Sequence, residues 1–148
     1  MKIIKDNIWS YLDKNIILII PINLVVKLNG ELVMGAGLAL QAKNRYPGVA
    51  KDFGKEISID NKIRPRFNTG NGWLFGFPTK VHYKDDSNYT LVTTALQEIQ
   101  KLAEKGYEHN FYVPLLGSGC GKLNYGDMLK LHIKYLLAPN ITLVLNNV

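Results

Sequence analysis

The apolar residues of this chain fall into two patterns: short continuous runs, and longer segments in which they recur at helical spacing. Short runs predict strands, and the run at 15–21 is rich in β-branched residues, so we expect it to be buried on both faces of a sheet. The predicted strands lie at residues 2–5, 15–21, 73–77, 111–115 and 141–145. They are spread along the whole chain, which leaves room for helices between them.

Helical spacing fills most of those intervals. The strongest helix begins at Ser87 or Asn88 and runs to Lys105, where Gly106 should end it. Its apolar face comprises Val92, Ala95, Leu96, Ile99, Leu102 and Ala103. Further helical segments are predicted at 8–11, capped by Asp6 or Asn7, and at 34–45, 49–53 and 124–137, with an irregular stretch at 57–72 containing at most one weak strand. Alternating strands and helices indicate an α/β fold with a mainly parallel sheet between helices.

Two glycine-rich segments stand where such a fold binds ligands. The first is Leu32-Val33-Met34-Gly35-Ala36-Gly37-Leu38-Ala39-Leu40-Gln41-Ala42-Lys43, and the second is Leu116-Gly117-Ser118-Gly119-Cys120-Gly121-Lys122. Each should follow a strand and precede a helix, at the carboxyl edge of the sheet. Glycine lets a ligand approach bare backbone, and free N–H groups at a helix start attract anions, phosphates above all. The alternative is a pair of tight turns before buried helices.

Composition narrows the classes of protein. The 148 residues suit one domain over 1–148, with an ordinary 47% hydrophobic and 20% charged content. A single cysteine, Cys120, excludes a disulfide framework. The apolar run at 16–22 is too short to span a bilayer, and no signal peptide is recognisable, so we expect a cytoplasmic protein that does not bind membranes. The net charge of +6 favours polyanions, and Lys62, Arg64 and Arg66 contribute to it; a merely solvated basic surface is the alternative.

With both glycine segments placed, the chain resembles a macrodomain, the ADP-ribose-binding module. Segments 4–9, 23–43 and 113–125 carry the resemblance, and Met-Gly-Ala-Gly at 34–37 is its most specific part. The likeness is to the branch with terminal ADP-ribose glycohydrolases, antitoxins that remove ADP-ribose from DNA, and small phage macrodomains of the Appr-1''-p processing type. It implies a three-layer α/β/α fold around a mixed, mostly parallel sheet.

The resemblance also implies a role for each matching residue. Asp6 would accept a hydrogen bond from the adenine amino group, with Asn7 and Ile8 offering backbone groups beside it. The distal ribose and diphosphate would be lined by Asn23, Met34, Gly35, Ala36 and Gly37. The second segment would wrap the phosphates through Leu116, Gly117, Ser118, Gly119, Cys120 and Gly121, and Tyr125 would lie near the adenine or second ribose.

Hydrolases of that branch use a lysine just after the strand that precedes the long helix, and Lys80 occupies this position. The family's lysine is understood to attack the anomeric carbon, which requires an unprotonated amine. One departure matters: related glycohydrolases carry an acid in the second glycine segment, whereas no carboxylate lies between Pro114 and Tyr125, and Asp127 is the nearest downstream. The general acid or base is therefore missing or supplied from elsewhere. An ordinary surface lysine is the alternative for Lys80.

Other residues with reactive or aromatic side chains carry weaker signals. Cys120 could act as a nucleophile, but no histidine adjoins it in sequence, and His82 could act as an acid or base near Lys80. His109 and His132 are expected at surface or helix positions. The aromatic residues of 73–77 fit the core better than a stacking surface.

Three functions remain open from the sequence. The first is hydrolysis of an ADP-ribosyl bond on a nucleic acid, a protein or a terminal phosphate. The second is capture of ADP-ribose or a related signalling nucleotide without turnover, and the third is nucleic-acid binding through charge alone. We expect no metal and no cofactor, and a monomer whose partner is ADP-ribose or an ADP-ribosylated substrate.

Overall fold

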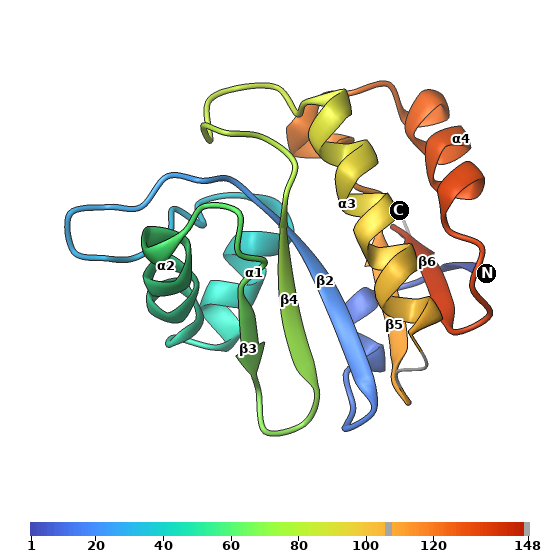
Figure 1. Ribbon diagram of the computed structural model, residues 1–148, viewed down its shortest axis with the longest axis horizontal. Coiled ribbons are helices and arrows are strands. Elements are labelled where there is room, and N and C mark those ends of the chain that lie inside the picture. The colour runs from blue at the N-terminus through green and yellow to red at the C-terminus, as the bar shows by residue number, and fades with distance from the viewer. Residues whose placement is uncertain (106–107, 147–148) are drawn as a thin grey trace.

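The computed structural model describes residues 1–105 and 108–146 and is built on one six-stranded sheet (Figure 1). Its strands are β1 (Lys2–Lys5), β2 (Ile16–Ile22), β3 (Arg66–Asn68), β4 (Trp73–Pro78), β5 (Asn110–Pro114) and β6 (Ile141–Leu145). They lie in the order β1-β6-β5-β2-β4-β3, and only β3 pairs antiparallel. The predicted mixed, mostly parallel sheet is confirmed.

Four α-helices cover the sheet. They are α1 (Gly37–Arg45), α2 (Val49–Ile59), α3 (Tyr89–Glu104) and α4 (Tyr125–Tyr135), with 3-10 turns η1 (Ile8–Tyr11) and η2 (Gly119–Gly121). In Figure 1, α3 and α4 lie on one side of the molecule, and α1 and α2 on the other. Within 1–105 and 108–146, no helix is both long and apolar enough to cross a membrane. Gly106, expected to end α3, lies outside the described residues.

Strand β2 forms the centre of the molecule and is buried on both faces, as its apolar run predicted. Ile17 and Ile19 pack in the core beneath α3 and α4, whereas Leu18 and Ile20 pack in the core beneath α1 and α2. All four side chains are at most 1% exposed. Because successive side chains of a strand alternate between faces, a strand with helices on both sides has to be apolar throughout.

Two expectations about the first half of the chain were wrong. Helix α2 runs on to Ile59, beyond the predicted end at Phe53, because Ile57 keeps the helical spacing and is buried. The first glycine segment does not directly follow a strand. After β2 the chain makes an excursion whose only β contact in the described residues is the isolated bridge between Val26 and Leu32. The Asn29-Gly30 turn lies within this excursion, with Gly30 at a φ of +88°.

Helix α2 packs against this excursion at Gly54, where no side chain fits. A Cβ there would overlap the Gly30 carbonyl oxygen and lie 2.7 Å from the Leu32 nitrogen. We expect Gly54→Ala to lower the free energy of unfolding by about 3 kcal/mol, although alanine is the better helix former. Urea unfolding measures this. In the control Gly48→Ala the new Cβ would lie 3.7 Å from the Phe67 ring, and a loss below about 0.5 kcal/mol is expected; equal losses would contradict the overlap.

Candidate functional site

A cleft of about 1500 Å³ lies where the parallel strands end, and its lining includes residues at or just after the carboxyl ends of β1, β2, β4, β5 and β6. Open α/β sheets bind ligands at this edge. The structure brings all but one of the predicted site residues together here: Asp6, Asn7, Ile8, Asn23, Met34, Gly35, Ala36, Gly37, Lys80, Gly117, Ser118, Gly119, Cys120, Gly121 and Tyr125. Leu116 is the exception. Tyr125, the first residue of α4, is 52% exposed at the cleft.

One wall of the cleft is the N-terminus of α1. Ala36 is its N-cap and offers no side-chain hydrogen bond, and no acidic residue lies in the first turn. Helices α3 and α4, by contrast, are capped by the side chains of Asn88 and Asn124. A Cβ built on Gly35 would meet no atom within 4 Å. Helix α1 therefore presents backbone N–H groups without a side-chain cap to an open space, which is the arrangement that favours an anion.

The opposite wall is the second glycine segment. Gly117 and Gly119 have φ values of +87° and +64°, a region that glycine adopts without strain. A Cβ on Gly117 would lie 3.0 Å from Met128 Sδ, whereas one on Gly119 would meet nothing within 4 Å. Gly117 therefore permits close packing on α4, and Gly119 faces open space.

The two walls meet at Cys120. A Cβ built on Gly37 would lie 3.4 Å from Cys120 Sγ, so the start of α1 and the second glycine segment lie against each other. Lys80 Nζ donates a hydrogen bond to the Cys120 carbonyl at 3.3 Å. The Ser87 N–H donates to the Gly121 carbonyl at 2.8 Å. The lysine thus lies at the contact between the two walls.

Leu116 was wrongly predicted to line the site. Its side chain is fully buried in the core beneath α3 and α4, and its N–H donates at 2.9 Å to Nε2 of His132. Because a backbone N–H can only donate, the ring proton lies on Nδ1, which donates to the Met128 carbonyl at 2.6 Å. His132 is on a helix, as one alternative held, but it is fully buried and anchors the start of the second glycine segment.

Burial lowers the pKa of His132 to about 4. An unfolded histidine titrates near 6.5, so below that pH the unfolded chain takes up a proton that the folded chain does not. The free energy of unfolding should therefore fall by about 3 kcal/mol between pH 6.5 and pH 4 through this residue. When the free energy of unfolding is measured across that pH range, it should change less with pH in His132→Gln than in wild type. Equal pH dependence in wild type and His132→Gln would contradict the assignment.

At the far end of the cleft, Asp6 is held by its neighbours. Its Oδ2 accepts a hydrogen bond from the Tyr11 hydroxyl at 2.5 Å, and its Oδ1 accepts from the Asn7 N–H at 2.7 Å. These two hydrogen bonds, that of Tyr11 first, hold the pKa of Asp6 below its usual range. Tyr11 in turn stacks on Tyr112 with ring centroids 4.8 Å apart. An oriented, ionised carboxylate is suited to accept from an amino group.

Asp6 is also the only carboxylate among the described residues that line the cleft. It follows β1, whereas Lys80 follows β4, and three strands lie between these two in the sheet. At the usual strand spacing the separation is roughly 19 Å. Asp6 therefore cannot serve Lys80 as a general acid, and the carboxylate missing from the second glycine segment is not replaced by another residue of the cleft. No group of three or more His, Cys, Asp or Glu residues in 1–105 and 108–146 is arranged to hold a metal ion.

Solved structures with the same architecture identify the fold. The macrodomain of Thermus aquaticus DarG matches with a TM-score of 0.78 at 20% identity, over 99% of this chain and 97% of that chain. The macrodomain of Mycobacterium tuberculosis DarG matches with a TM-score of 0.75 at 24% identity, over 99% and 98%. The chain has the macrodomain fold. Thermosipho africanus DarTG in complex with ADP-ribose gives a TM-score of 0.77 at 22% identity, over 97% of this macrodomain and 41% of that chain.

No family model matches the macrodomain, but its sequence is similar to those of curated proteins. It is 31% identical over 112 residues to the DNA ADP-ribosyl glycohydrolase of Mycobacterium tuberculosis, which covers 71% of this chain and 32% of the relative. It is 30% identical over 135 residues to a DNA ADP-ribosyl transferase-DNA ADP-ribosyl glycohydrolase fusion protein of Thermosipho africanus, covering 76% and 35%. The macrodomain thus spans about a third of the length of the curated relatives it matches.

Asn23 lines the cleft, but its side chain already forms hydrogen bonds with the backbone of the macrodomain. Its amide donates to the Val33 carbonyl at 2.8 Å, and its Oδ1 accepts from the Val25 N–H at 2.9 Å. The side chain is 8% exposed. Its evident role is to hold together the two ends of the excursion between β2 and α1, and so to place Met34 and Gly35 at the cleft.

Sequence reasoning missed six polar or aromatic residues of the lining: Lys5, Gln41, Thr79, Tyr83, Ser87 and Asn146. Gln41 lies on α1, and its Oε1 accepts from the Trp9 indole N–H at 2.8 Å. Thr79 and Ser87 are only 3% and 7% exposed, which is unusual for polar residues between a strand and a helix. The available signal was their position, because β4 ends and α3 begins at the carboxyl edge of the sheet.

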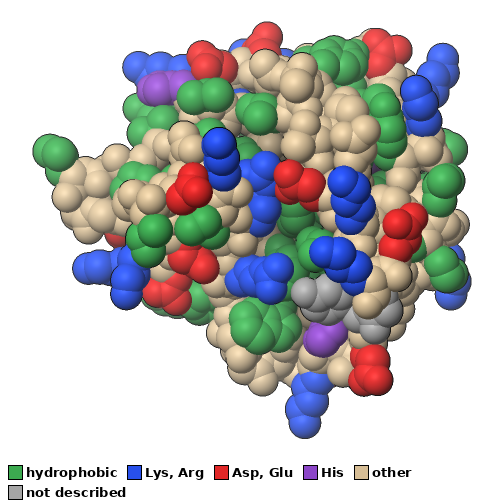
Figure 2. Space-filling model, in the orientation of Figure 1, with side chains coloured by type: hydrophobic (Ala, Val, Ile, Leu, Met, Phe, Trp, Pro, Cys, Tyr) green, Lys and Arg blue, Asp and Glu red, His purple; other side chains and the backbone are tan. Residues whose placement is uncertain are grey.

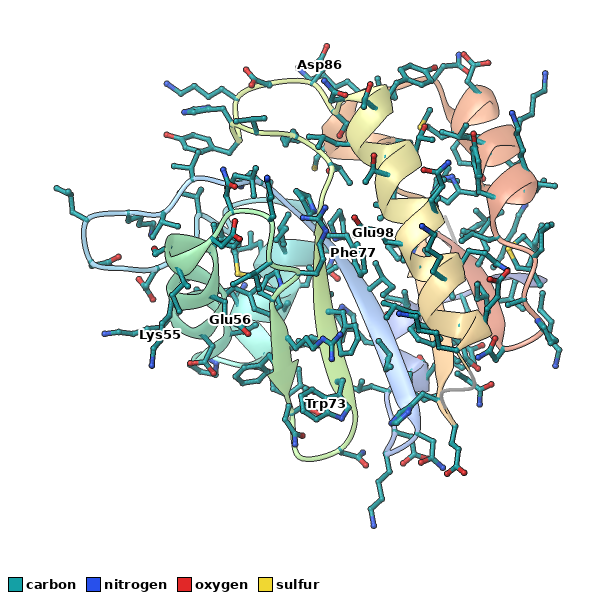
Figure 3. The ribbon with its side chains drawn as sticks, viewed as in Figure 1. Lys55, Glu56, Trp73, Phe77, Asp86 and Glu98 are labelled. Carbon is teal, nitrogen blue, oxygen red and sulfur yellow. The ribbon has the colours of Figure 1, made fainter. Side chains whose placement is uncertain are left out.

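The basic segment 62–66 is less available to a polyanion than its composition suggested. Arg64 donates to both carboxylate oxygens of Glu98, at 2.7 and 3.0 Å, and Figure 3 shows Glu98 projecting from α3. Arg66 lies over the Phe75 ring, 4.5 Å from its centroid. On the face shown in Figure 2, Lys and Arg side chains alternate with Asp and Glu and form no continuous basic surface.

The remaining candidates have structural positions. His82 does not line the cleft; it stacks on Tyr83 and accepts a hydrogen bond through Nδ1 from the Lys84 N–H at 3.1 Å. Phe75 and Phe77 are buried in the core beneath α3 and α4, and Figure 3 shows Phe77 between the sheet and α3. Their assignment to the core is confirmed. Cys120 carries an exposed, free thiol.

Proposed function

We propose that this macrodomain binds ADP-ribose in the cleft and hydrolyses the bond between ADP-ribose and a DNA base. The observation that carries the proposal is the contact between the two glycine-rich walls with Lys80 Nζ beside it. Two backbone segments rich in N–H groups can hold a diphosphate between them without cationic side chains. The curated relatives' names support the substrate, since each is called a DNA ADP-ribosyl glycohydrolase.

The order of the strands supports one orientation of the ligand in the cleft. Adenine would bind near Asp6, whose ionised carboxylate accepts from the amino group, with Asn7 and Ile8 beside it. The diphosphate would lie between Gly35–Gly37 and Gly117–Gly121. The distal ribose would then reach Lys80, about four strand spacings from Asp6. In this orientation the anomeric carbon of the distal ribose would lie beside Lys80.

In the proposed reaction, the unprotonated amine of Lys80 attacks the anomeric carbon of the distal ribose. The base departs with the electron pair of the bond that breaks and takes up the proton that the amine loses. The sugar ring then opens as the lysine nitrogen and the anomeric carbon form an imine, and water hydrolyses this imine to free the lysine and ADP-ribose. Since no carboxylate of the cleft is near Lys80, the leaving group has to stabilise its own negative charge. A ring nitrogen flanked by carbonyl groups, as in a nucleobase, meets this requirement.

The lack of a carboxylate near Lys80 in the described cleft also favours a second candidate function, in which the macrodomain captures ADP-ribose without turnover. Nucleic-acid binding through charge alone is disfavoured, because the arginines of the basic segment are engaged by Glu98 and Phe75. We expect the active form to be a monomer without a cofactor.

Calorimetry with ADP-ribose, followed by time courses, separates these functions. The time courses use an ADP-ribosylated single-stranded oligonucleotide, an ADP-ribosylated protein and ADP-ribose-1''-phosphate. Heat of binding together with release of the oligonucleotide supports the proposal. Binding without release of any of the three supports the capture module. No heat at millimolar ADP-ribose would overturn both.

A further inference from the structure

The segment between β4 and α3, residues 80–87 and here called the 80–87 loop, is fixed at both ends. The Asn88 N–H donates to the Thr79 carbonyl at 2.7 Å, which closes the base of the loop. Near one end, the Val81 carbonyl accepts from the Leu24 N–H at 2.9 Å, and at the other the Ser87 N–H donates to Gly121. The loop therefore has a defined position against the second glycine segment and against the excursion that follows β2.

Tyr83 is the aromatic residue of this loop, and it lines the cleft three residues after Lys80. The ring stacks on His82 with centroids 4.2 Å apart and an interplanar angle of 30°. His82 is itself held, since its Nδ1 accepts from the Lys84 N–H and its carbonyl accepts from the Asp85 N–H at 3.0 Å. Within residues 1–105 and 108–146, no second ring stacks on Tyr83, and the residue remains 44% exposed. One face of the ring is supported and the other is available.

The charged residues of the 80–87 loop do not explain why an aromatic side chain is exposed there. The loop carries two lysines and two aspartates, Lys80, Lys84, Asp85 and Asp86, which cancel. Figure 3 shows Asp86 projecting outward from the loop. A supported aromatic face is suited to a planar ring, and stacking of a base on such a face contributes about 1–3 kcal/mol. Carboxylate side chains and phosphates have no ring to stack.

We propose that Tyr83 stacks on the nucleobase from which ADP-ribose is removed, and thereby sets the preference for a base over leaving groups without a ring. This inference rests on the proposed function. The base has to be accessible, so the substrate is single-stranded or has its base turned out of the helix. His82 is a positioning residue, because it supports the face of Tyr83 opposite the ligand.

The test compares Tyr83→Ala and Tyr83→Phe with the control Tyr89→Ala. Tyr89 is 47% exposed and close in sequence, but it does not line the cleft. Equilibrium affinities for an ADP-ribosylated single-stranded oligonucleotide and for free ADP-ribose are measured in proteins that also carry Lys80→Ala, which prevents turnover, and the otherwise wild-type Lys80→Ala protein is the reference. We expect Tyr83→Ala to weaken oligonucleotide binding about 10-fold and free ADP-ribose less than about 2-fold. Tyr83→Phe and Tyr89→Ala should stay within about 3-fold of wild type for both.

Steady-state kinetics and the dependence of affinity on salt concentration test the role of Tyr83 independently of the affinities above. In the Lys80 background, Tyr83→Ala should raise KM for the oligonucleotide and leave the kinetics of ADP-ribose-1''-phosphate unchanged. The 10-fold effect should persist between 50 and about 200 mM salt, whereas a phosphate contact would weaken with salt. Equal losses for both ligands, or no loss in Tyr83→Ala, would overturn the inference and leave the proposed function intact. If wild type binds neither ligand, the proposed function fails and the inference fails with it.

Discussion

Replacing Lys80 with alanine is expected to reduce the rate of release from ADP-ribosylated DNA on the order of 10³-fold, the range typical for loss of a group that reacts directly with substrate. Lys80 is the only amine that lines the cleft near the contact between the glycine-rich walls in the described structure. The affinity for ADP-ribose should change less than about 5-fold, because the diphosphate is held by backbone groups. Single-turnover kinetics and calorimetry measure the two quantities separately.

Two further variants sharpen this prediction. Lys84→Ala removes the same charge from the same loop outside the cleft lining and should leave the rate within about 2-fold of wild type. Lys80→Arg keeps the charge but not a nucleophilic amine, so it should be as inactive as Lys80→Ala. Full activity in Lys80→Arg would show that the lysine acts through its charge alone. Full activity in Lys80→Ala would exclude any direct role.

Replacing Gly35 with aspartate is expected to weaken ADP-ribose binding at least about 100-fold. Nothing lies within 4 Å of a Cβ at this position, so the fold accommodates the side chain, which enters the space assigned to the diphosphate. A carboxylate beside a diphosphate costs several kcal/mol through like-charge repulsion. Calorimetry measures the affinity, and thermal unfolding confirms that the variant is folded.

The matched controls separate charge from shape. Asn71→Asp adds the same charge in the turn before β4, at the opposite end of the strands, and should leave affinity within about 2-fold of wild type. Gly35→Ala adds only a methyl group and should weaken binding less than aspartate does. Unchanged affinity in Gly35→Asp would mean that the diphosphate does not lie against the start of α1.

Much of the framework was visible in the sequence because it depends on local patterns. Ile16–Ile22 is apolar throughout because helices cover both its faces, and Asn88 and Asn124 mark helix starts through their own side chains. The walls of the cleft were predictable for a similar reason. Glycines mark these segments in the sequence, and Gly37, Gly117 and Gly119 have the positive φ values that glycine adopts without strain.

What could not be predicted depends on partners distant in sequence. The buried His132 accepts a hydrogen bond from the N–H of Leu116, sixteen positions away. Arg64 is paired with Glu98, thirty-four positions away. Leu116 itself was assigned to the site because its neighbours belong there, but it lies in the turn after β5, and its side chain packs in the core beneath α3 and α4. The spacing of apolar residues along the chain does not indicate which distant residues form hydrogen bonds or ion pairs with each other.

The meeting of the two walls at Cys120 has a practical consequence. The chain contains one cysteine, and its thiol is exposed at the seam beside Gly37. A thiol-reactive fluorophore or spin label would attach there and nowhere else, without any engineered mutation. The emission or mobility of that single label would change when a nucleotide enters the cleft beside it.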